Sequence, residues 1–242
     1  GAGQVVLVGF PNTGKSALVG ALTRAKVTVA DYPFSTTVPV SGMMAYEDIY
    51  IQLVDLPPVT NEEMPRGMAG TLRMADLIAV IADGSSDDCL EQFQGCLDLL
   101  RKRRILETPG EESGLHMKRA EDFLLIITKT DLAGAEERID LLRGMLPEGW
   151  FMTQVSVNSV EKLETLRKIF FERLRIIRVY SKIPGKDPDM TTPFILKKGQ
   201  TVLDMAELVH RDFPHKLKYA RVWGSAKFPG QSVEKSFQLA DR

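Results

Sequence analysis

One segment near the N-terminus constrains the fold of this chain more than any other feature. Residues Gly9 to Ser16 read Gly-Phe-Pro-Asn-Thr-Gly-Lys-Ser, which is a full match to the pattern G-x-x-x-x-G-K-S/T. The apolar run Val5 to Val8 precedes the segment, and a helical pattern that starts at Ala17 follows it. Such a loop between a strand and a helix binds phosphate, because backbone N–H groups and the helix N-terminus face the anion. A simple strand-to-helix turn would explain two glycines, but not a Lys-Ser pair at this offset.

The side chains of this loop have separate predicted roles. We expect the Lys15 ammonium to reach the outer phosphates of a nucleotide, and the Ser16 hydroxyl to bind Mg²⁺. The nucleotide-binding set that we predict here comprises Asn12, Thr13, Gly14, Lys15, Ser16 and Ala17.

Charge gives no sign of a broad surface for nucleic acids. The formal net charge is -1, so the chain has no global basic field that would attract DNA or an anionic membrane. A basic run, Arg101 to Arg104, could contact RNA, but we favour a solvated helix end, where positive charge suits the helix dipole.

Composition is that of a soluble globular protein in a reducing compartment. Hydrophobic residues make up 44% and charged residues 26% of the 242 positions. Cys89 and Cys96 lie seven positions apart in a helical pattern, which favours packing over a disulfide or a metal site. We find neither a membrane-spanning run nor a signal peptide, and therefore expect a cytoplasmic protein without a membrane partner.

Strand-like and helical segments alternate along the first 177 residues, which we predict to form one domain. The expected strands cover 5–8, 38–46, 49–55, 77–82, 123–127 and 151–155, and the expected helices 15–24, 67–74, 87–104, 135–145 and 161–175. This alternation predicts an α/β fold with a doubly wound, mostly parallel sheet. Ligands of such sheets bind beyond the carboxyl ends of the strands, where the polar motifs of this chain lie.

Residues 178–242 are predicted to form a second, small α+β domain. We expect strands over 178–183, 194–196, 220–223 and 232–237. Residues Thr201 to Asp204 resemble a capping box and predict a helix start. His210 and His215 lack acidic or cysteine partners at ligand spacing, so we favour surface or packing roles for them. No closing element follows Leu239, and we expect this domain to be truncated at its C-terminus.

Five segments together resemble the guanine-nucleotide motifs of the translation-factor class of P-loop GTPases. Within that class, the chain looks like the Obg and developmentally regulated GTP-binding protein branch, which often carries a β-grasp-like TGS domain. The resemblance rests on Gly9–Ser16, Asp31–Thr36, Asp55, Leu72-Arg73 near Ala75-Asp76, Thr128–Asp131, Ser156, Ile183–Lys186, Pro193-Phe194 and Leu217–Lys227. It covers nearly the entire chain.

The resemblance implies a guanine site built from two loops. Asp131 would accept hydrogen bonds from the guanine N1 and N2 groups, which adenine cannot supply. Lys129 would pack over the base, and Ser156 and Val157 would form the last guanine loop. Thr128 stands where Asn is usual, so part of the bracing contact between phosphate loop and base would be lost.

The resemblance also implies a magnesium site and points to slow turnover. Thr36 would close over the γ-phosphate and bind Mg²⁺, with Thr37 as the fallback, and Asp55 would hold the ion through water. Pro58 replaces the Gly of a D-x-x-G pattern and has no N–H to give the γ-phosphate. Val59 occupies the place where some GTPases carry the Gln that orients the attacking water.

Asn12 suggests a way around the missing Gln. In related GTPases that lack it, the Asn of a G-x-P-N-x-G-K-S loop helps bind a potassium ion, which supplies positive charge. The resemblance therefore implies potassium-stimulated hydrolysis of GTP to GDP, with Lys15, Thr36 and Asn12 as the catalytic set.

Three functions remain open from the sequence. The first is a slow GTPase switch, linked to the ribosome or RNA by analogy with the branch. The second is a guanine-nucleotide-binding adaptor that does not hydrolyse GTP and whose TGS-like domain binds a partner. The third is an ATPase, which Asp131 disfavours.

Overall fold

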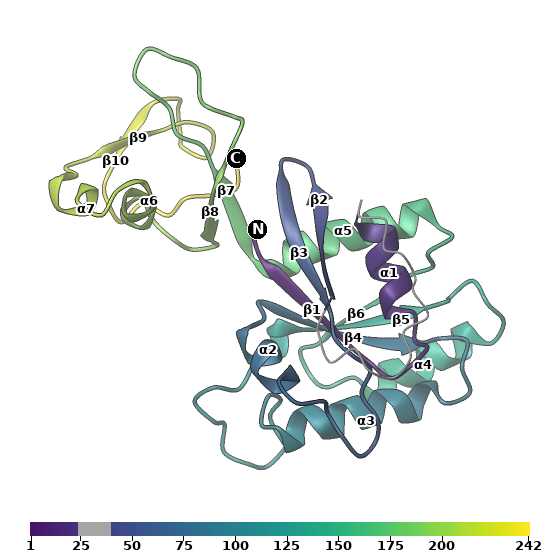
Figure 1. Ribbon diagram of the computed structural model, residues 1–242. Helices are drawn as coiled ribbons and strands as arrows, with labels where there is room; N and C mark the ends of the chain where they lie inside the picture. The colour runs from purple at the N-terminus through teal and green to yellow at the C-terminus, as the bar shows by residue number, and fades with distance from the viewer. Residues whose placement is uncertain (24–39) are drawn as a thin grey trace. The chain divides into compact units, whose positions relative to one another are not determined.

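The computed structural model describes residues 1–23 and 40–242, which form two compact units. One unit contains mainly Gly3–Tyr46 and Tyr50–Leu174, and the other mainly Arg175–Arg242. Figure 1 shows the helices and strands of each unit.

The first unit is built on a six-stranded sheet with the order β2-β3-β1-β4-β5-β6. Its strands are β1 (Gln4–Val8), β2 (Val40–Tyr46), β3 (Ile49–Asp55), β4 (Leu77–Asp83), β5 (Phe123–Thr128) and β6 (Phe151–Gln154). All strand pairs from β3 to β6 are parallel. The predicted α/β fold with a mostly parallel, doubly wound sheet is therefore confirmed.

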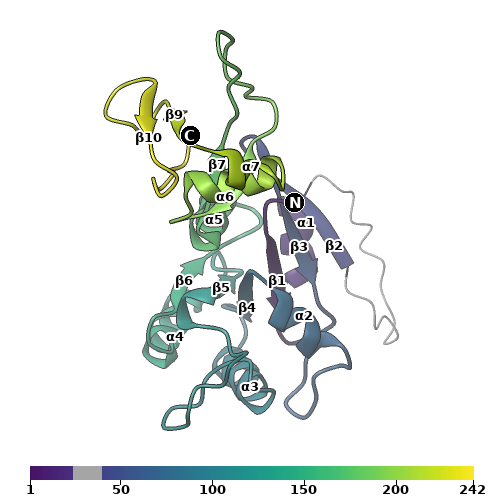
Figure 2. The ribbon, with the colours of Figure 1, turned by 90° about the vertical axis from the view of Figure 1, so that its left-hand side faces the viewer.

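Helices cover both faces of this sheet, which explains why its inner strands are continuous apolar runs. Every residue of β4 and of β5 is buried. The helices are α1 (Lys15–Leu22), α2 (Met68–Met74), α3 (Cys89–Lys102), α4 (Ala135–Met145) and α5 (Val160–Leu174), with a short 3-10 turn at Ala120–Asp122. Helices α2, α3 and α4 share one hydrophobic core with the sheet, and α1 and α5 lie on the opposite face (Figures 1 and 2).

The parallel arrangement brings five strand ends to one edge of the sheet. Strands β1, β3, β4, β5 and β6 end at Val8, Asp55, Asp83, Thr128 and Gln154. Loops that follow these residues are far apart in sequence but meet beyond the same edge, which is where such sheets bind ligands.

The second unit consists of two two-stranded sheets and two helices. Strand β7 (Ile176–Val179) pairs with β8 (Phe194–Lys197), and β9 (Ala220–Val222) pairs with β10 (Gln231–Val233), both antiparallel. The helices are α6 (Val202–Val209) and α7 (Phe213–Lys216). The predicted capping box is present, because the Thr201 N–H donates to Asp204 Oδ2 at 2.7 Å.

Two strand predictions for this unit were wrong, and one helix was missed. The strand predicted over 178–183 is β7, which starts at Ile176 and stops at Val179. Val179 pairs with Phe194, so the next rung would need Pro193, which has no N–H to donate. The strand predicted over 232–237 is only β10, and helix α7 was not predicted.

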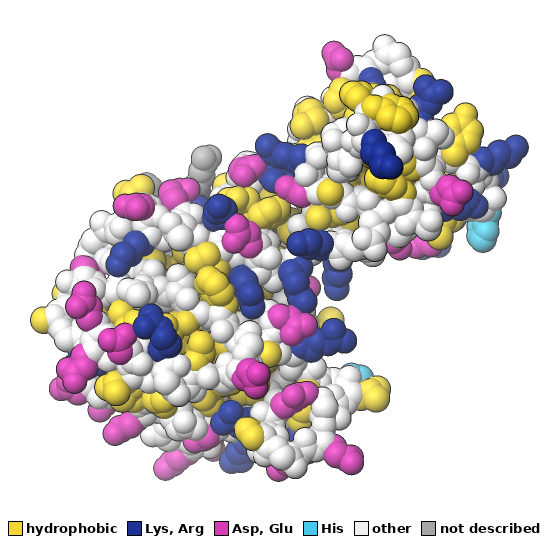
Figure 3. Space-filling view, turned by 180° about the vertical axis from the view of Figure 1, so that it is seen from behind, with side chains coloured by type: hydrophobic (Ala, Val, Ile, Leu, Met, Phe, Trp, Pro, Cys, Tyr) yellow, Lys and Arg dark blue, Asp and Glu magenta, His cyan; other side chains and the backbone are white. Residues whose placement is uncertain are grey.

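Charged side chains of both signs are interspersed on the face drawn in Figure 3. In the basic run, Lys102, Arg103 and Arg104 are exposed around the end of α3. The Arg103 carbonyl oxygen accepts a hydrogen bond from Arg73 Nη2 at 2.7 Å. These contacts fit a solvated helix end.

Candidate functional site

The loop between β1 and α1 has the backbone geometry of an anion-binding turn. Gly14 precedes the helix with φ at 89°, a left-handed conformation in which a side chain would be strained. Asn12 is also left-handed, with φ at 62°. Thr13 Oγ1 donates to the Phe10 carbonyl oxygen at 2.9 Å and ties the loop across itself. The phosphate loop predicted from the motif therefore runs directly into the N-terminus of α1, which begins at Lys15.

Lys15 is buried and turned back into its own loop. Its Nζ donates to the carbonyl oxygens of Gly9 at 3.1 Å and Phe10 at 3.3 Å. Burial lowers the pKa of the Lys15 ammonium, while the nearby Asp55 carboxylate opposes that shift. The positive charge of buried Lys15 is only partly offset by Asp55, and a phosphate bound in the loop would give Lys15 an anionic partner.

Ser16 and Asp55 form a pair that fits a magnesium ion. Ser16 Oγ donates to Asp55 Oδ2 at 2.6 Å. Asp55 Oδ1 is buried and has no hydrogen-bond partner within the described residues. Burial raises the pKa of Asp55, and the hydrogen bond from Ser16 and the positive charge of Lys15 oppose this rise. Mg²⁺ prefers hydroxyl and carboxylate oxygens, so this unsatisfied carboxylate beside a phosphate loop suits the ion.

A cavity of about 130 Å³ lies beside the phosphate loop. Its lining joins the predicted guanine residues to the start of α1: Gly14, Ala17, Thr128, Lys129, Asp131, Leu132, Val155, Ser156, Val157 and Asn158. Asp131 Oδ2 accepts a hydrogen bond from Asn158 Nδ2 at 3.2 Å, which holds the carboxylate in place. This bond, with others from the backbone and Ser156, lowers the pKa of Asp131, so the group is an anionic acceptor at neutral pH.

Thr128 braces the phosphate loop through its hydroxyl. Thr128 is buried, and its Oγ1 lies 2.6 Å from the Thr13 carbonyl oxygen and 3.2 Å from that of Ala82. The sequence suggested that replacing Asn by Thr loses part of the contact between phosphate loop and base. The contact to the phosphate loop is present, and the amide group that an Asn would add is not.

Lys129 connects the guanine loop with two other elements. Its Nζ donates to the Asn12 carbonyl oxygen at 2.9 Å and to Asp83 Oδ2 at 2.7 Å. The backbone of Lys129 is left-handed, with φ at 56°, which costs a non-glycine residue about 1–2 kcal/mol.

Val59 does not project into the site. Its side chain is fully buried in the core with Leu56, and its N–H donates to the Gly9 carbonyl oxygen at 3.1 Å. Pro58, beside it, is exposed. The chain after β3 is therefore joined to the phosphate loop by backbone, and no side chain at position 59 reaches a nucleotide.

Other predicted residues are placed less fully. The expected switch residues Thr36 and Thr37, with the loop Asp31–Thr36, lie outside the described part of the chain. Asn12, the expected potassium ligand, is exposed in the phosphate loop.

Sequence reasoning missed Asp83 and Asn158 as site residues. Asp83 ends β4 at the ligand edge of the sheet, and that position was the available signal for it. Asn158 lies two residues after Ser156, and its amide suits a carboxylate partner, but no motif drew attention to it.

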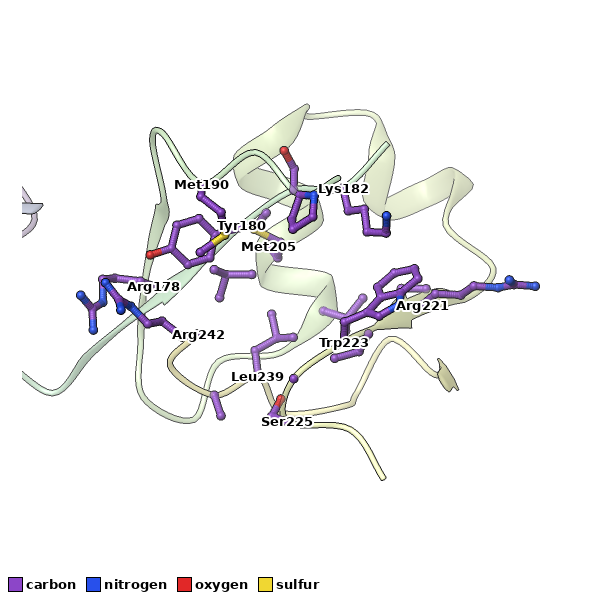
Figure 4. A pocket seen from close by; sticks show the side chains of 18 residues that line it. Arg178, Tyr180, Lys182, Met190, Met205, Arg221, Trp223, Ser225, Leu239 and Arg242 are labelled. Atoms are coloured by element: carbon purple, nitrogen blue, oxygen red, sulfur yellow. The ribbon is translucent and has the colours of Figure 1, made fainter. Parts of the chain in front are cut away.

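The second unit contains a larger cavity of about 600 Å³. Figure 4 shows Tyr180 and Met205 on one side of it and Leu239 and Trp223 on the other. Lys182 Nζ lies 5.3 Å from the centre of the Trp223 ring. The described lining contains no Asp, Glu, Cys or His side chain. Likewise, the described residues hold no cluster of three or more His, Cys, Asp or Glu that could bind a metal.

Two family models match the chain. The model described as a 50S ribosome-binding GTPase matches residues 4–109, and that described as a TGS domain matches residues 177–241. Among curated proteins, an uncharacterized GTP-binding protein of Methanocaldococcus jannaschii is 30% identical over 300 residues, covering 100% of this chain and 76% of its own. GTP-binding protein 1 of Schizosaccharomyces pombe is 28% identical, covering 96% and 79%. Developmentally-regulated G-protein 3 of Arabidopsis thaliana is 26% identical, covering 100% and 80%.

Fold, site and matches define a P-loop GTPase-family protein with a TGS domain, and the chain binds guanine nucleotide. More narrowly, it belongs to the developmentally regulated GTP-binding proteins of the Obg branch, as the sequence predicted. No helix among the described residues has the length and apolar character needed to cross a membrane.

Proposed function

We propose that this protein is a slow GTPase switch that hydrolyses GTP to GDP and phosphate with Mg²⁺. The pair of Ser16 and Asp55 carries the proposal, because it puts beside the phosphate loop a carboxylate oxygen that has no hydrogen-bond partner among the described residues. The two domains predicted over 1–177 and 178–242 would be the switch and a partner-binding module.

In this mechanism, a water oxygen attacks the γ-phosphorus of GTP. The bond between the γ-phosphorus and the β–γ bridging oxygen breaks, and GDP leaves. Lys15, released from the Gly9 and Phe10 carbonyl oxygens, would stabilise charge on the outer phosphates. Ser16 and Asp55 would hold Mg²⁺, which neutralises charge on the β- and γ-phosphates. Thr36 is proposed to close over the γ-phosphate as a further magnesium ligand.

We expect slow intrinsic turnover because position 59 lacks the Gln side chain that orients the attacking water in some GTPases. Val59 is buried in the core and cannot orient water, and Pro58 has no N–H to donate. We therefore propose that potassium, held with the help of the exposed Asn12, supplies the missing positive charge. The test is GTP turnover in potassium and in sodium at equal ionic strength and fixed Mg²⁺. Faster turnover in potassium is expected, and equal rates would refute the potassium part of the proposal.

The buried Val59 also favours a second candidate, a nucleotide-binding adaptor. Such a protein would retain GTP unchanged, and its TGS domain would act as the partner-binding surface. Ribosome or RNA is the proposed partner in either case. Co-sedimentation with ribosomes in the GTP-bound and GDP-bound states tests this, and equal absence from the ribosomal pellet in both states would contradict it.

A further inference from the structure

A buried carboxylate at the end of β4 contacts the guanine loop, and no motif assigns it a role. Asp83 is 7% exposed, and its Oδ2 lies 2.7 Å from Lys129 Nζ. A buried carboxylate without a partner is costly, so this ion pair satisfies Asp83 and fixes the Lys129 ammonium at the same time.

Asp83 is itself held in one orientation. Its Oδ1 accepts hydrogen bonds from the Ser85 N–H at 2.9 Å and from Ser85 Oγ at 2.6 Å. The backbone beside it is also constrained, because a Cβ on Gly84 would lie 2.9 Å from the Thr128 carbonyl oxygen. Asp83 also sits opposite Thr128 in the register of β4 and β5. The carboxylate therefore points at Lys129 from a rigid position.

Lys129 connects the Asp83 carboxylate with the nucleotide site. Its Nζ also bonds the Asn12 carbonyl oxygen in the phosphate loop, and its side chain lines the cavity that contains Asp131. A free lysine side chain would lose rotamer entropy on being ordered over a base, and this loss would oppose binding. The ion pair with Asp83 orders the side chain before the nucleotide arrives, which favours binding.

We propose that Asp83 is a positioning residue that fixes Lys129 as a preformed wall of the guanine cavity and links that wall to the phosphate loop. The ligand is the base of a guanine nucleotide, either GDP or GTP. This inference rests on nucleotide binding by the cavity and does not require hydrolysis.

The test compares D83N with wild type in GDP affinity and in the dissociation rate of a fluorescent GDP analogue. Asn keeps the shape of Asp83 and its acceptor for Ser85, but turns an amide toward the Lys129 ammonium. We expect about tenfold weaker GDP affinity, mainly through faster dissociation, because a charge-assisted hydrogen bond is lost. Asp87→Asn is the matched control, because Asp87 lies in the loop that follows Asp83 and pairs instead with Arg138 at 2.6 Å. It should bind GDP as wild type does.

A double-mutant cycle separates positioning from general destabilisation. In a Lys129→Met background, D83N should cause no further loss of GDP affinity, because the lysine side chain that Asp83 positions is absent. An equal loss in both backgrounds, or wild-type affinity for D83N, would overturn the proposal. If D83N does not fold, Ser85→Ala keeps the carboxylate and removes one of its two orienting bonds. Faster GDP release with an unchanged melting temperature would then support the proposal, and unchanged release would refute it.

Hydrolysis need not occur for this result to be interpretable. If D83N weakens GDP binding while neither protein turns over GTP, the positioning role stands and the switch proposal fails. If wild type turns over GTP and D83N binds GDP as wild type does, the switch proposal stands and the positioning role fails.

Discussion

Ser16 Oγ and Asp55 Oδ2 lie 2.6 Å apart, although the residues are 39 positions apart in the chain. This contact joins the start of α1 to the end of β3 at the expected magnesium position. Asp55→Asn should therefore abolish the gain in GDP affinity that Mg²⁺ gives wild type, because a neutral amide is a poor magnesium ligand. GDP titrations with Mg²⁺ and with a chelator measure the effect, and Asp98→Asn on the exposed side of α3 is the control.

The same variant has a second expected property in the absence of Mg²⁺. Burial raises the folded-state pKa of Asp55, so ionised Asp55 opposes folding at pH values above that pKa. At pH 7 without metal, the melting temperature of Asp55→Asn should equal or exceed that of wild type. At a pH low enough to protonate Asp55, the melting temperature of the variant should be equal to or lower than that of wild type. A lower melting temperature at pH 7 would show that the carboxylate stabilises the metal-free fold.

Thr128→Val should weaken both the fold and nucleotide binding. The substitution keeps the shape but removes the hydroxyl that bonds the Thr13 and Ala82 carbonyl oxygens in a buried site. Leaving buried acceptors unsatisfied costs about 1–3 kcal/mol in the free energy of unfolding. Urea denaturation measures this loss, and Thr165→Val, at an exposed position of α5, should change stability by less than about 0.5 kcal/mol. Similar losses for both variants would contradict the bracing role.

Asp131→Asn should change the base preference of the site. Asp131 is held by Asn158 as an anionic acceptor, which suits the N–H groups of guanine. An amide can instead donate to the carbonyl group that xanthine carries where guanine has an amino group. We expect GTP affinity to fall by at least about tenfold and XTP affinity to rise. Competition of both nucleotides against a labelled GDP analogue measures the change. An unaltered preference for GTP would remove Asp131 from the base site.

The two thiols should be inert in the folded protein. Burial raises the pKa of Cys89 to about 11 and that of Cys96 to about 12, so neither forms the reactive thiolate at pH 8. A thiol reagent at that pH should label neither cysteine in native protein and both in denaturant. Fast labelling of the native chain would show that α3 opens.

The parallel sheet and the nucleotide loops could be read from the sequence because local signals agreed with each other. Apolar runs such as Leu77 to Ala82 are too short for helices in this context and end in polar residues at the ligand edge. The phosphate loop and Asp131 were recognisable because their spacing is fixed by contact with one small molecule. The second unit was harder, since its strands are three or four residues long and their ends depend on pairing partners such as Pro193.

Contacts between distant segments could not be predicted from pattern alone. The bond of Asp83 to Lys129 and that of Asn158 to Asp131 depend on how two strands and their loops meet in space. At Val59, by contrast, the motif suggested a place in the site that the structure does not show. The motif position of Val59 suggested a place near the γ-phosphate, but an apolar side chain gains more from the core than from a polar site.

Conversion of GTP to GDP by this chain is tested most directly by a single-turnover measurement. Purified protein in excess over labelled GTP, with Mg²⁺, is sampled over time in potassium and in sodium buffer. We expect slow, complete formation of GDP and phosphate, which is faster in potassium and strongly reduced for Lys15→Ala. GTP that remains bound and intact in both buffers, with GTP affinity unimpaired, would contradict the switch and identify the protein as an adaptor.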